Sequence, residues 1–311
     1  MRTDLAIETT ALSKRYGDVL AVDALDLAIP TGQFFGLLGP NGAGKTSAIH
    51  MLSTLLRPTA GEARVAGYDV RTDKLAIRKK IGVVFQELAL DRTLTVDENL
   101  RFAGRLNGLS RDTIATRSDE LLEIFDLTRK RSTPVAALSG GMKRALDIAR
   151  GLIHQPQILF LDEPTIGLDL PNRRAIWRHV AQLRAARGVT VFLTTHYLEE
   201  AAECDDVAFL ATGRIKLRGD PHRLVDSLGR YILEIESDHP DELAARLAPR
   251  LGAGLIELDR LQYVCNREPD ELAALQAELA ASVRAVRWRR PNLNDVFLWV
   301  NRPVTTERRA A

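Results

Sequence analysis

Short apolar runs alternate with stretches of helical periodicity along most of the chain, between about residue 34 and residue 217. The helical stretches that separate the runs are typical of βα units. We therefore predict an α/β domain built around a parallel sheet with helices on both sides. Five of the runs have the length and composition of strands that are covered on both faces: residues 33–38, 81–85, 158–162, 189–194 and 207–210.

Two segments depart from this alternation. Residues 5–29 alternate between apolar and polar side chains, which predicts an antiparallel β layer beside the parallel sheet. The pattern is largely helical from residue 95 to about residue 154, so a helical subdomain over about residues 87–154 should interrupt the order of the sheet. A helix over residues 45–56 should follow the first parallel strand and end before Pro58.

The composition changes after Asp220 and Pro221, and Lys216 is the last lysine of the chain. Residues 230–288 predict the order β-α-β-β-α-β, which is that of a ferredoxin-like module, and a last helix follows over residues 292–300. These changes predict three parts: a first domain over residues 1–228, a small α+β domain over residues 229–302 and a flexible tail over residues 303–311.

The balance of charge is close to even, with 43 Lys and Arg against 41 Asp and Glu in 311 residues. A protein that coats nucleic acid is usually more basic, so no nucleic-acid partner is expected. Cys204 and Cys265 form no CxxC pair, which argues against a disulfide framework or a structural zinc site. The sequence shows neither a secretory leader nor an apolar run of about 18 residues, so any membrane-spanning part should belong to another chain.

A glycine-rich segment follows the first parallel strand and fits the pattern GxxxxGK[ST]. Backbone N–H groups of such a loop, together with a helix N-terminus, bind phosphate oxygens. Lys45 would reach the β- and γ-phosphates, and the Thr46 hydroxyl would ligate Mg²⁺. The sequence therefore predicts that ATP is bound by Gly39, Pro40, Asn41, Gly42, Ala43, Gly44, Lys45, Thr46 and Ser47.

The apolar strand at residues 158–162 ends in two carboxylates, Asp162 and Glu163. Because this strand end should lie beside the phosphate loop, Asp162 suits a role in holding Mg²⁺. Glu163 suits polarising the water that attacks the γ-phosphate. A strand that ends in charged residues is common by itself, but together with the phosphate loop it predicts a nucleotide hydrolase.

Further segments resemble the motifs of ABC ATPases, in the order that this family uses. Leu138-Ser139-Gly140-Gly141-Met142 resembles the signature loop and precedes the strand that ends in Asp162. The resemblance covers residue 5 to about residue 228. The other matching residues are Gln86, similar to the Q-loop glutamine; Asp169, similar to the D-loop aspartate; His196, similar to the switch histidine; and Tyr16, similar to the aromatic residue that stacks on adenine.

The resemblance implies a role for each of these residues. Ser139, Gly140 and Gly141 would bind the γ-phosphate at the start of a helix. His196 would hydrogen-bond the same phosphate and help to order Glu163 and its water. Gln86 would link the γ-phosphate and the metal to the membrane partner. The resemblance also implies that the metal ligands are Thr46, Gln86 and Asp162, and that Tyr16 and Asp169 belong to the nucleotide site.

The resemblance extends to one branch of the family. Met142 stands where the signature usually has Gln, and Met at this place resembles exporters of drugs and antibiotics. Residues 291–298 resemble the ending of daunorubicin-resistance-type and nodulation-export-type subunits. From the residues themselves, this ending predicts an N-capped amphipathic helix that docks Phe297 on a neighbouring surface, without catalysis.

The expected function is that of the ATPase subunit of an exporter for drugs, antibiotics or lipid-like compounds. Family geometry implies a head-to-tail homodimer closing on two Mg·ATP, bound to a separate transmembrane permease at the cytoplasmic face of the membrane. Two alternatives stay open. One is an importer ATPase subunit, and the other is a soluble ABC ATPase acting in translation, DNA repair or cofactor assembly.

Overall fold

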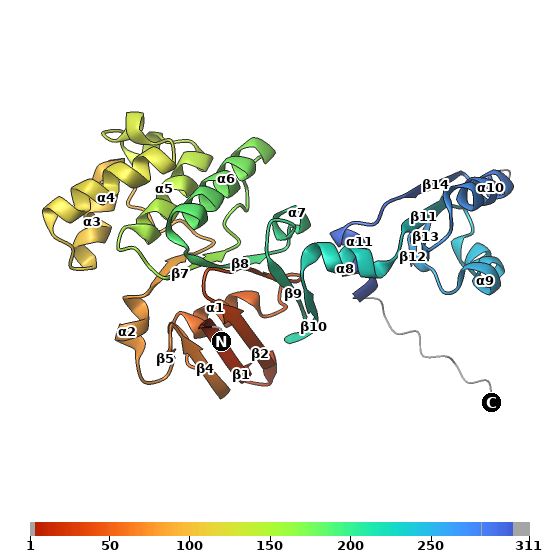
Figure 1. Cartoon of the computed structure of the whole chain (residues 1–311), viewed down its shortest axis with the longest axis horizontal. Helices are drawn as coiled ribbons and strands as arrows, with labels where there is room; N and C mark the ends of the chain where they lie inside the picture. The colour runs from red at the N-terminus through yellow and green to blue at the C-terminus, as the bar shows by residue number, and fades with distance from the viewer. Residues whose placement is uncertain (1–3, 281, 301–311) are drawn as a thin grey trace. The chain divides into compact units, whose positions relative to one another are not determined.

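The computed structural model describes residues 4–280 and 282–300, and the contacts within the chain separate two compact units, one up to Arg218 and one from Gly219 (Figure 1). Helix α8 (Pro221–Leu228) groups with the second unit, where it packs against α11 (Leu293–Val300). The domain boundary between residues 228 and 229 stays a prediction, and the expected tail at residues 303–311 lies outside the described residues. No helix in the described ranges is long and apolar enough to span a bilayer.

The first unit contains an antiparallel sheet and a six-stranded sheet. The antiparallel sheet has the order β2-β1-β4-β5 and consists of β1 (Leu5–Tyr16), β2 (Val19–Pro30), β4 (Ala60–Val65) and β5 (Tyr68–Asp69). The six-stranded sheet has the order β10-β9-β3-β8-β7-β6 and consists of β3 (Phe34–Leu38), β6 (Ile81–Val84), β7 (Ile158–Asp162), β8 (Thr190–Thr195), β9 (Asp206–Ala211) and β10 (Arg214–Gly219). The five strands predicted from apolar runs are all in this sheet.

Every residue of β3, β7 and β8 is buried, which explains why these strands read as continuous apolar runs. The three strands run parallel, with Leu38 beside Thr195 and Asp162 beside Thr194. Their carboxyl ends therefore meet at one edge of the sheet, which is where α/β proteins place ligands. Helix α1 (Lys45–Leu52) begins at this edge and ends earlier than the expected residue 56.

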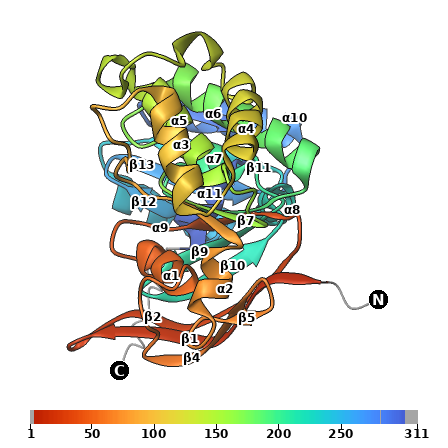
Figure 2. The ribbon, with the colours of Figure 1, turned by 90° about the vertical axis from the view of Figure 1, so that its left-hand side faces the viewer.

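The longer helices of the first unit begin at side chains that accept a hydrogen bond from the backbone. Thr95 and Glu98 form a reciprocal capping box, and Ser110, Ser139 and Asp169 cap the next three helices. Helices α3, α4, α5 and α6 gather away from the antiparallel sheet in both views (Figures 1 and 2). The helices are α2 (Lys74–Arg78), α3 (Val96–Leu106), α4 (Arg111–Ile124), α5 (Gly140–Leu152), α6 (Leu170–Arg187) and α7 (Leu198–Ala201), with short 3₁₀ turns at Thr128–Lys130 and Val135–Ala137.

The second unit contains an antiparallel sheet of order β12-β13-β11-β14. Leu and Tyr side chains from one face of this sheet pack with leucines of α9 and α10. The assignment to the ferredoxin-like class stays a prediction. The elements follow each other as β11 (Tyr231–Glu236), α9 (Pro240–Leu251), β12 (Leu255–Glu257), β13 (Arg260–Cys265), α10 (Pro269–Leu279) and β14 (Ala285–Arg289), before α11.

The C-terminal motif at residues 291–298 is held by an ion pair between a buried carboxylate and a partly exposed guanidinium. The guanidinium of Arg289 donates to both carboxylate oxygens of Asp295 at 2.7 Å, and Asp295 is fully buried in α11. The same guanidinium donates to Glu234 of β11. This arrangement supports the structural interpretation of the motif, in which the helix is held against its neighbours.

Candidate active site

The glycine-rich loop connects β3 to α1 and has a backbone that only glycine accommodates at two positions. Gly42 and Gly44 have φ angles of +80° and +108°. A Cβ atom on Gly44 would lie 2.2 Å from the backbone oxygen of Ala21, so the loop packs against β2 without room for a side chain. The first turn of α1 carries no acidic residue, which leaves its N–H groups available to an anion.

A pocket of about 430 Å³ lies at this loop. It brings together the loop, the predicted Gln86 and the predicted Glu163, which are more than 30 residues apart along the chain. Gly39 and Pro40 do not line the pocket, but their carbonyl oxygens accept hydrogen bonds from Lys45 Nζ at 2.9 and 3.1 Å. The lining residues are Ala21, Asn41, Gly42, Gly44, Lys45, Thr46, Ser47, Gln86, Glu163 and Ile166.

Glu163 is the centre of an ionic group in the pocket. Lys45 Nζ lies 3.1 Å from one carboxylate oxygen, and His196 Nδ1 lies 3.2 Å from the other. The side chains of Lys45 and Glu163 are 4% and 9% exposed, so water screens their attraction only weakly. The three residues therefore already have the proximity that a phosphate-binding cation, a base and an orienting histidine require.

The backbone of Glu163 is held in an unusual conformation, with a φ angle of +46°. Its N–H group donates to the backbone oxygen of Thr194 at 3.0 Å and to Thr194 Oγ1 at 3.2 Å. Thr194 Oγ1 in turn donates to Asp162 Oδ1 at 2.5 Å. The neighbouring strand thus fixes both predicted carboxylates, and the strained backbone at Glu163 is consistent with a functional position.

The sequence analysis did not identify Thr194. The sequence shows only that Thr194 stands near the end of a predicted strand, and its place directly beside Asp162 follows from the pairing of β7 with β8. A second residue that it missed is Arg144 on α5, which donates to the backbone oxygens of Phe85 and Gln86 at 2.7 and 2.6 Å. Burial lowers the pKa of the Arg144 guanidinium, whereas its attraction to Asp147 raises it.

The oxygen donors at the end of β7 suit a magnesium ion. Thr46 Oγ1 lies 3.3 Å from Asp162 Oδ1, and Gln86 lines the same pocket. Hydroxyl, carboxylate and amide oxygens are the ligand types that Mg²⁺ prefers. In the described residues no cluster of three or more His, Cys, Asp or Glu side chains is placed to hold a metal. These residues therefore fit a Mg²⁺ ion that is held jointly by the chain and by phosphate oxygens.

Other predicted residues lie outside this pocket. Ser139 caps α5 by accepting a hydrogen bond from the Met142 N–H group, and both Ser139 and Gly140 are exposed. Asp169 caps α6 in the same way. The structure therefore does not bring the signature segment or Asp169 to the pocket lining of the same chain.

Tyr16 lies close to the phosphate loop. Its ring is 47% exposed, and its hydroxyl oxygen lies 3.3 Å from Ser47 Oγ. Lys14 Nζ lies over the ring, 5.1 Å from its centre, and the half-exposed ring beside the loop could stack with a planar group such as adenine. The place of Tyr16 is therefore compatible with the predicted role.

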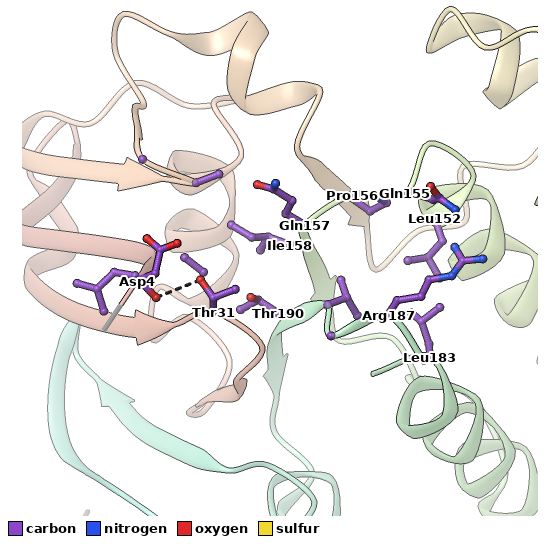
Figure 3. A pocket seen from close by; sticks show the side chains of 16 residues that line it. Asp4, Thr31, Leu152, Gln155, Pro156, Gln157, Ile158, Leu183, Arg187 and Thr190 are labelled. Atoms are coloured by element: carbon purple, nitrogen blue, oxygen red, sulfur yellow. Dashed lines mark hydrogen bonds between the residues drawn. The ribbon is translucent and has the colours of Figure 1, made fainter. Parts of the chain in front are cut away.

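A second cavity, of about 510 Å³, lies at the opposite ends of β7 and β8 (Figure 3). Asp4, Thr31, Gln157 and Thr190 line it, and none of the predicted site residues does. Its arginine, Arg187, pairs with Glu120 at 2.6 Å. Cavity size alone would therefore have pointed to the wrong end of the sheet.

Comparisons with known proteins show the family to which the chain belongs. A family model described as ABC transporter matches residues 22–166. The chain is 41% identical over 304 residues to the daunorubicin resistance ATP-binding protein DrrA3 of Streptomyces coeruleorubidus, with 95% of each protein covered. It is also 41% identical over 299 residues to the Nod factor export ATP-binding protein I of Sinorhizobium fredii, with 96% of this chain and 86% of that protein covered.

Solved structures of ATP-binding cassettes match most of the chain. The structure of cbiO1 from Clostridium perfringens, part of the ABC transporter complex cbiONQ, has a TM-score of 0.68 at 26% identity and covers 80% of this chain and 96% of its own. An ATP-binding cassette solved as a dimer in a post-hydrolysis state with ADP and Pi has a TM-score of 0.63 at 27% identity, with coverages of 69% and 98%.

Proposed function

Because this chain belongs to the ATP-binding subunits of ABC transporters, we propose that its ATPase activity drives export of a hydrophobic drug, antibiotic or lipid-like compound. The observation that carries this proposal is the 41% identity to a daunorubicin resistance ATP-binding protein over 95% of both chains. That alignment includes the second unit and the motif around Asp295, and not only the ATPase core. Importers and soluble ABC ATPases share the core, so the full-length match favours export.

We further propose that the working unit contains two copies of this chain arranged head to tail. Each chain carries one phosphate loop and one signature segment, and the pocket of a single chain has no residue from positions 139–141. Ser139 and Gly140 are exposed, and they stand at the N-terminus of α5, where backbone N–H groups face outward. The signature of one copy would complete the nucleotide site of the other, closing on two Mg·ATP.

The residues at the phosphate loop would perform distinct steps in hydrolysis. Lys45 would exchange its contact with Glu163 for phosphate oxygens, which leaves the carboxylate of Glu163 to accept a proton from the attacking water. His196 would then orient that carboxylate and hydrogen-bond the γ-phosphate. Thr46, Asp162 and Gln86 would hold Mg²⁺, which supplies charge neutralisation at the phosphates when it is bound.

The membrane partner is a separate permease chain, and we propose that it docks at the cytoplasmic face on the helical subdomain. Phe102 and Leu106 of α3 are 56% and 71% exposed, beside the Arg101 and Arg105 side chains of the same helix. Arg144 ties the backbone of Gln86 to α5. If the helical subdomain moves when ATP binds, Gln86 and the docked permease would therefore move with it.

A single variant tests the catalytic and the transporter proposals. Glu163→Gln should keep ATP binding and lower kcat about 100-fold or more, because it removes the proposed base but retains the size of the side chain. The tagged variant, captured from detergent-solubilised source cells with Mg·ATP, should retain a membrane protein with several spans, identified by mass spectrometry. Lys45→Ala is the matched control, since it should weaken nucleotide binding itself.

The outcomes separate the parts of the proposal. Normal turnover by Glu163→Gln would contradict the role of the base. Capture of ribosomal or DNA-repair proteins without a membrane protein would place the same ATPase among the soluble members of the family. A captured permease would also be the chain in which the transported compound should be sought, since one such chain contacts the cargo.

A further inference from the structure

A buried carboxylate that the proposed mechanism does not use joins two segments of the active site. Glu200 of α7 is only 3% exposed. Its Oε2 atom accepts a hydrogen bond from Thr195 Oγ1 at 2.6 Å, and its Oε1 atom accepts one from Thr165 Oγ1. Both threonines are fully buried, so water does not compete for these contacts.

The two threonines belong to the segments that carry the proposed base and the switch histidine. Thr165 lies two residues after Glu163, in the segment that ends at Asp169. Thr195 directly precedes His196. The separation of 3.2 Å between His196 and Glu163 therefore depends on how these two segments are fixed to each other.

A second contact joins the same two segments. Arg173 of α6 donates through Nε to the backbone oxygen of Leu168 at 3.0 Å, and its guanidinium carbon lies 3.8 Å from the centre of the Tyr197 ring. The N–H group of Tyr197 donates to Thr195 Oγ1 at 2.9 Å. The hydroxyl of Thr195 is thus occupied on both sides, by Tyr197 as donor and by Glu200 as acceptor.

We propose that Glu200 is a positioning residue for ATP hydrolysis, which holds the segment from Glu163 to Asp169 and the segment around His196 in one relative placement. The inference rests on the proposed roles of Glu163 and His196. Glu200 acts through the two threonines and touches no nucleotide-binding residue of the phosphate loop. Its loss should therefore change the rate of hydrolysis and leave nucleotide affinity nearly unchanged.

The free-energy cost of burying the Glu200 carboxylate supports its proposed role as a positioning residue. Burial raises the pKa of Glu200, and the hydrogen bonds from Thr165 and Thr195 act in the opposite direction. A buried carboxyl group stabilises a fold only when its partners are well placed, and an apolar side chain would fill the same space at lower cost.

The test compares four variants of the full chain. Glu200→Ala should lower kcat about 10- to 100-fold, the usual effect of a misplaced catalytic group, with KM for ATP within about threefold of the wild type. Glu200→Gln should retain most of the activity, because its amide can accept from one hydroxyl and donate to the other. Glu199→Ala, which removes the exposed neighbour on the same helix, is the control, and Glu163→Gln is the reference for a lost base.

Variants of the two threonines keep the test informative if Glu200→Ala does not fold. Thr165→Val removes one hydroxyl at nearly constant volume, whereas Thr165→Ser keeps the hydroxyl and should restore kcat. If Glu200 joins the two segments as one unit, combining Thr165→Val with Thr195→Val should lower kcat little more than the stronger single change.

The inference would be overturned by wild-type kcat in folded Glu200→Ala, by a rise in KM at unchanged kcat, or by losses in Thr165→Val and Thr195→Val that multiply. Glu200→Gln as inactive as Glu200→Ala would also contradict it, since the charge and not the hydrogen bonds would then matter. Failure of the proposed catalytic roles is recognised separately, because Glu163→Gln would then turn over ATP at the wild-type rate. Failure of the export proposal is recognised by the capture experiment, which would then retain no membrane protein.

Discussion

At the scale of single residues, a partly buried histidine should make the stability of the first unit depend on pH. His154 Nε2 lies 2.9 Å from the backbone oxygen of Ile81, so this nitrogen carries the proton. Burial lowers the pKa of His154, and the hydrogen bond to Ile81 opposes this shift only in part. The unfolded chain therefore binds a proton more readily than the folded one as the pH falls below about 6.5.

The sign of the effect follows directly. The contribution of His154 to stability is fully present above the unfolded pKa of about 6.5 and is lost as the pH falls through the lower, folded pKa. We expect the wild-type melting temperature to fall more between pH 7.5 and pH 5.5 than that of His154→Gln, whose amide keeps an N–H donor for Ile81. Thermal melts at several pH values measure this, with His222→Gln, a change at an exposed histidine, as control. The same change of melting temperature with pH in the wild type, His154→Gln and His222→Gln would contradict the prediction.

The residues that spacing alone identified belong to contiguous patterns, whereas Gln86, His196 and Tyr16 were identified only through the family resemblance. Lys45 and Thr46 belong to one loop, and Asp162 and Glu163 to one strand end, so spacing alone predicts them. Thr194 and Glu200 act through contacts with residues about 30 positions away, as the hydrogen bonds to Asp162 and Thr165 show. Such partners become visible only when the register of β7 and β8 is known.

At the scale of elements, β6 and α5 lie so close together that a single methyl group added between them should lower the stability of the first unit. A Cβ atom on Gly82 would lie 2.3 Å from the backbone oxygen of Gly151 and 3.1 Å from Pro156 Cγ. Because the nearest atom is backbone, the helix would have to shift. The shift would reach Ser139 and Arg144, since both belong to or cap the same helix.

Gly82→Ala should therefore destabilise the first unit by about 1–3 kcal/mol, the usual cost of overpacking a core. The matched control is Gly151→Ala, whose Cβ would meet a side-chain methyl, Val84 Cγ2, at 3.3 Å and should be tolerated better. Thermal melts of the two variants measure the difference. Equal melting temperatures for Gly82→Ala and the wild type would show that β6 and α5 separate without cost.

Element boundaries were predictable where burial is uniform and not where it alternates. The fully buried β7 was predicted at its observed residues, Ile158–Asp162. Strands β4 and β10 were missed, because β4 (AGEARV) alternates between exposed and buried positions and β10 (RIKLRG) carries three basic residues. The first helix was predicted too long, since Thr54 has a φ angle of +67° and the chain turns there.

At the scale of the whole molecule, the exposed residues Ser139 and Gly140 of the signature segment make the second copy of the chain part of the proposed site. A Cβ atom on Gly140 would meet only Leu168 Cδ2, at 3.7 Å, which is ordinary contact. A side chain placed there should therefore leave the fold intact and project from the exposed start of α5. In the head-to-tail arrangement it would face the γ-phosphate bound by the other copy.

Gly140→Asp, added to Glu163→Gln, should then abolish the ATP-dependent dimer, because a carboxylate would stand beside a phosphate of the same charge. Gly140→Asn in the same background has the same size without the charge and should weaken the dimer far less. Light scattering with and without Mg·ATP measures the dimer, and equilibrium binding of a fluorescent ATP analogue to dilute protein measures the affinity of one chain.

Together, the dimer measurement and the affinity measurement show whether the signature segment contacts the nucleotide bound by the other copy or the nucleotide bound by its own chain. If it acts across the interface, the affinity of the single chain should stay within about twofold, since no residue of positions 139–141 lines its pocket. A parallel loss of affinity in Gly140→Asp would mean that the signature reaches the nucleotide of its own chain. The head-to-tail dimer would then be wrong, whereas the roles of Lys45 and Glu163 would stand.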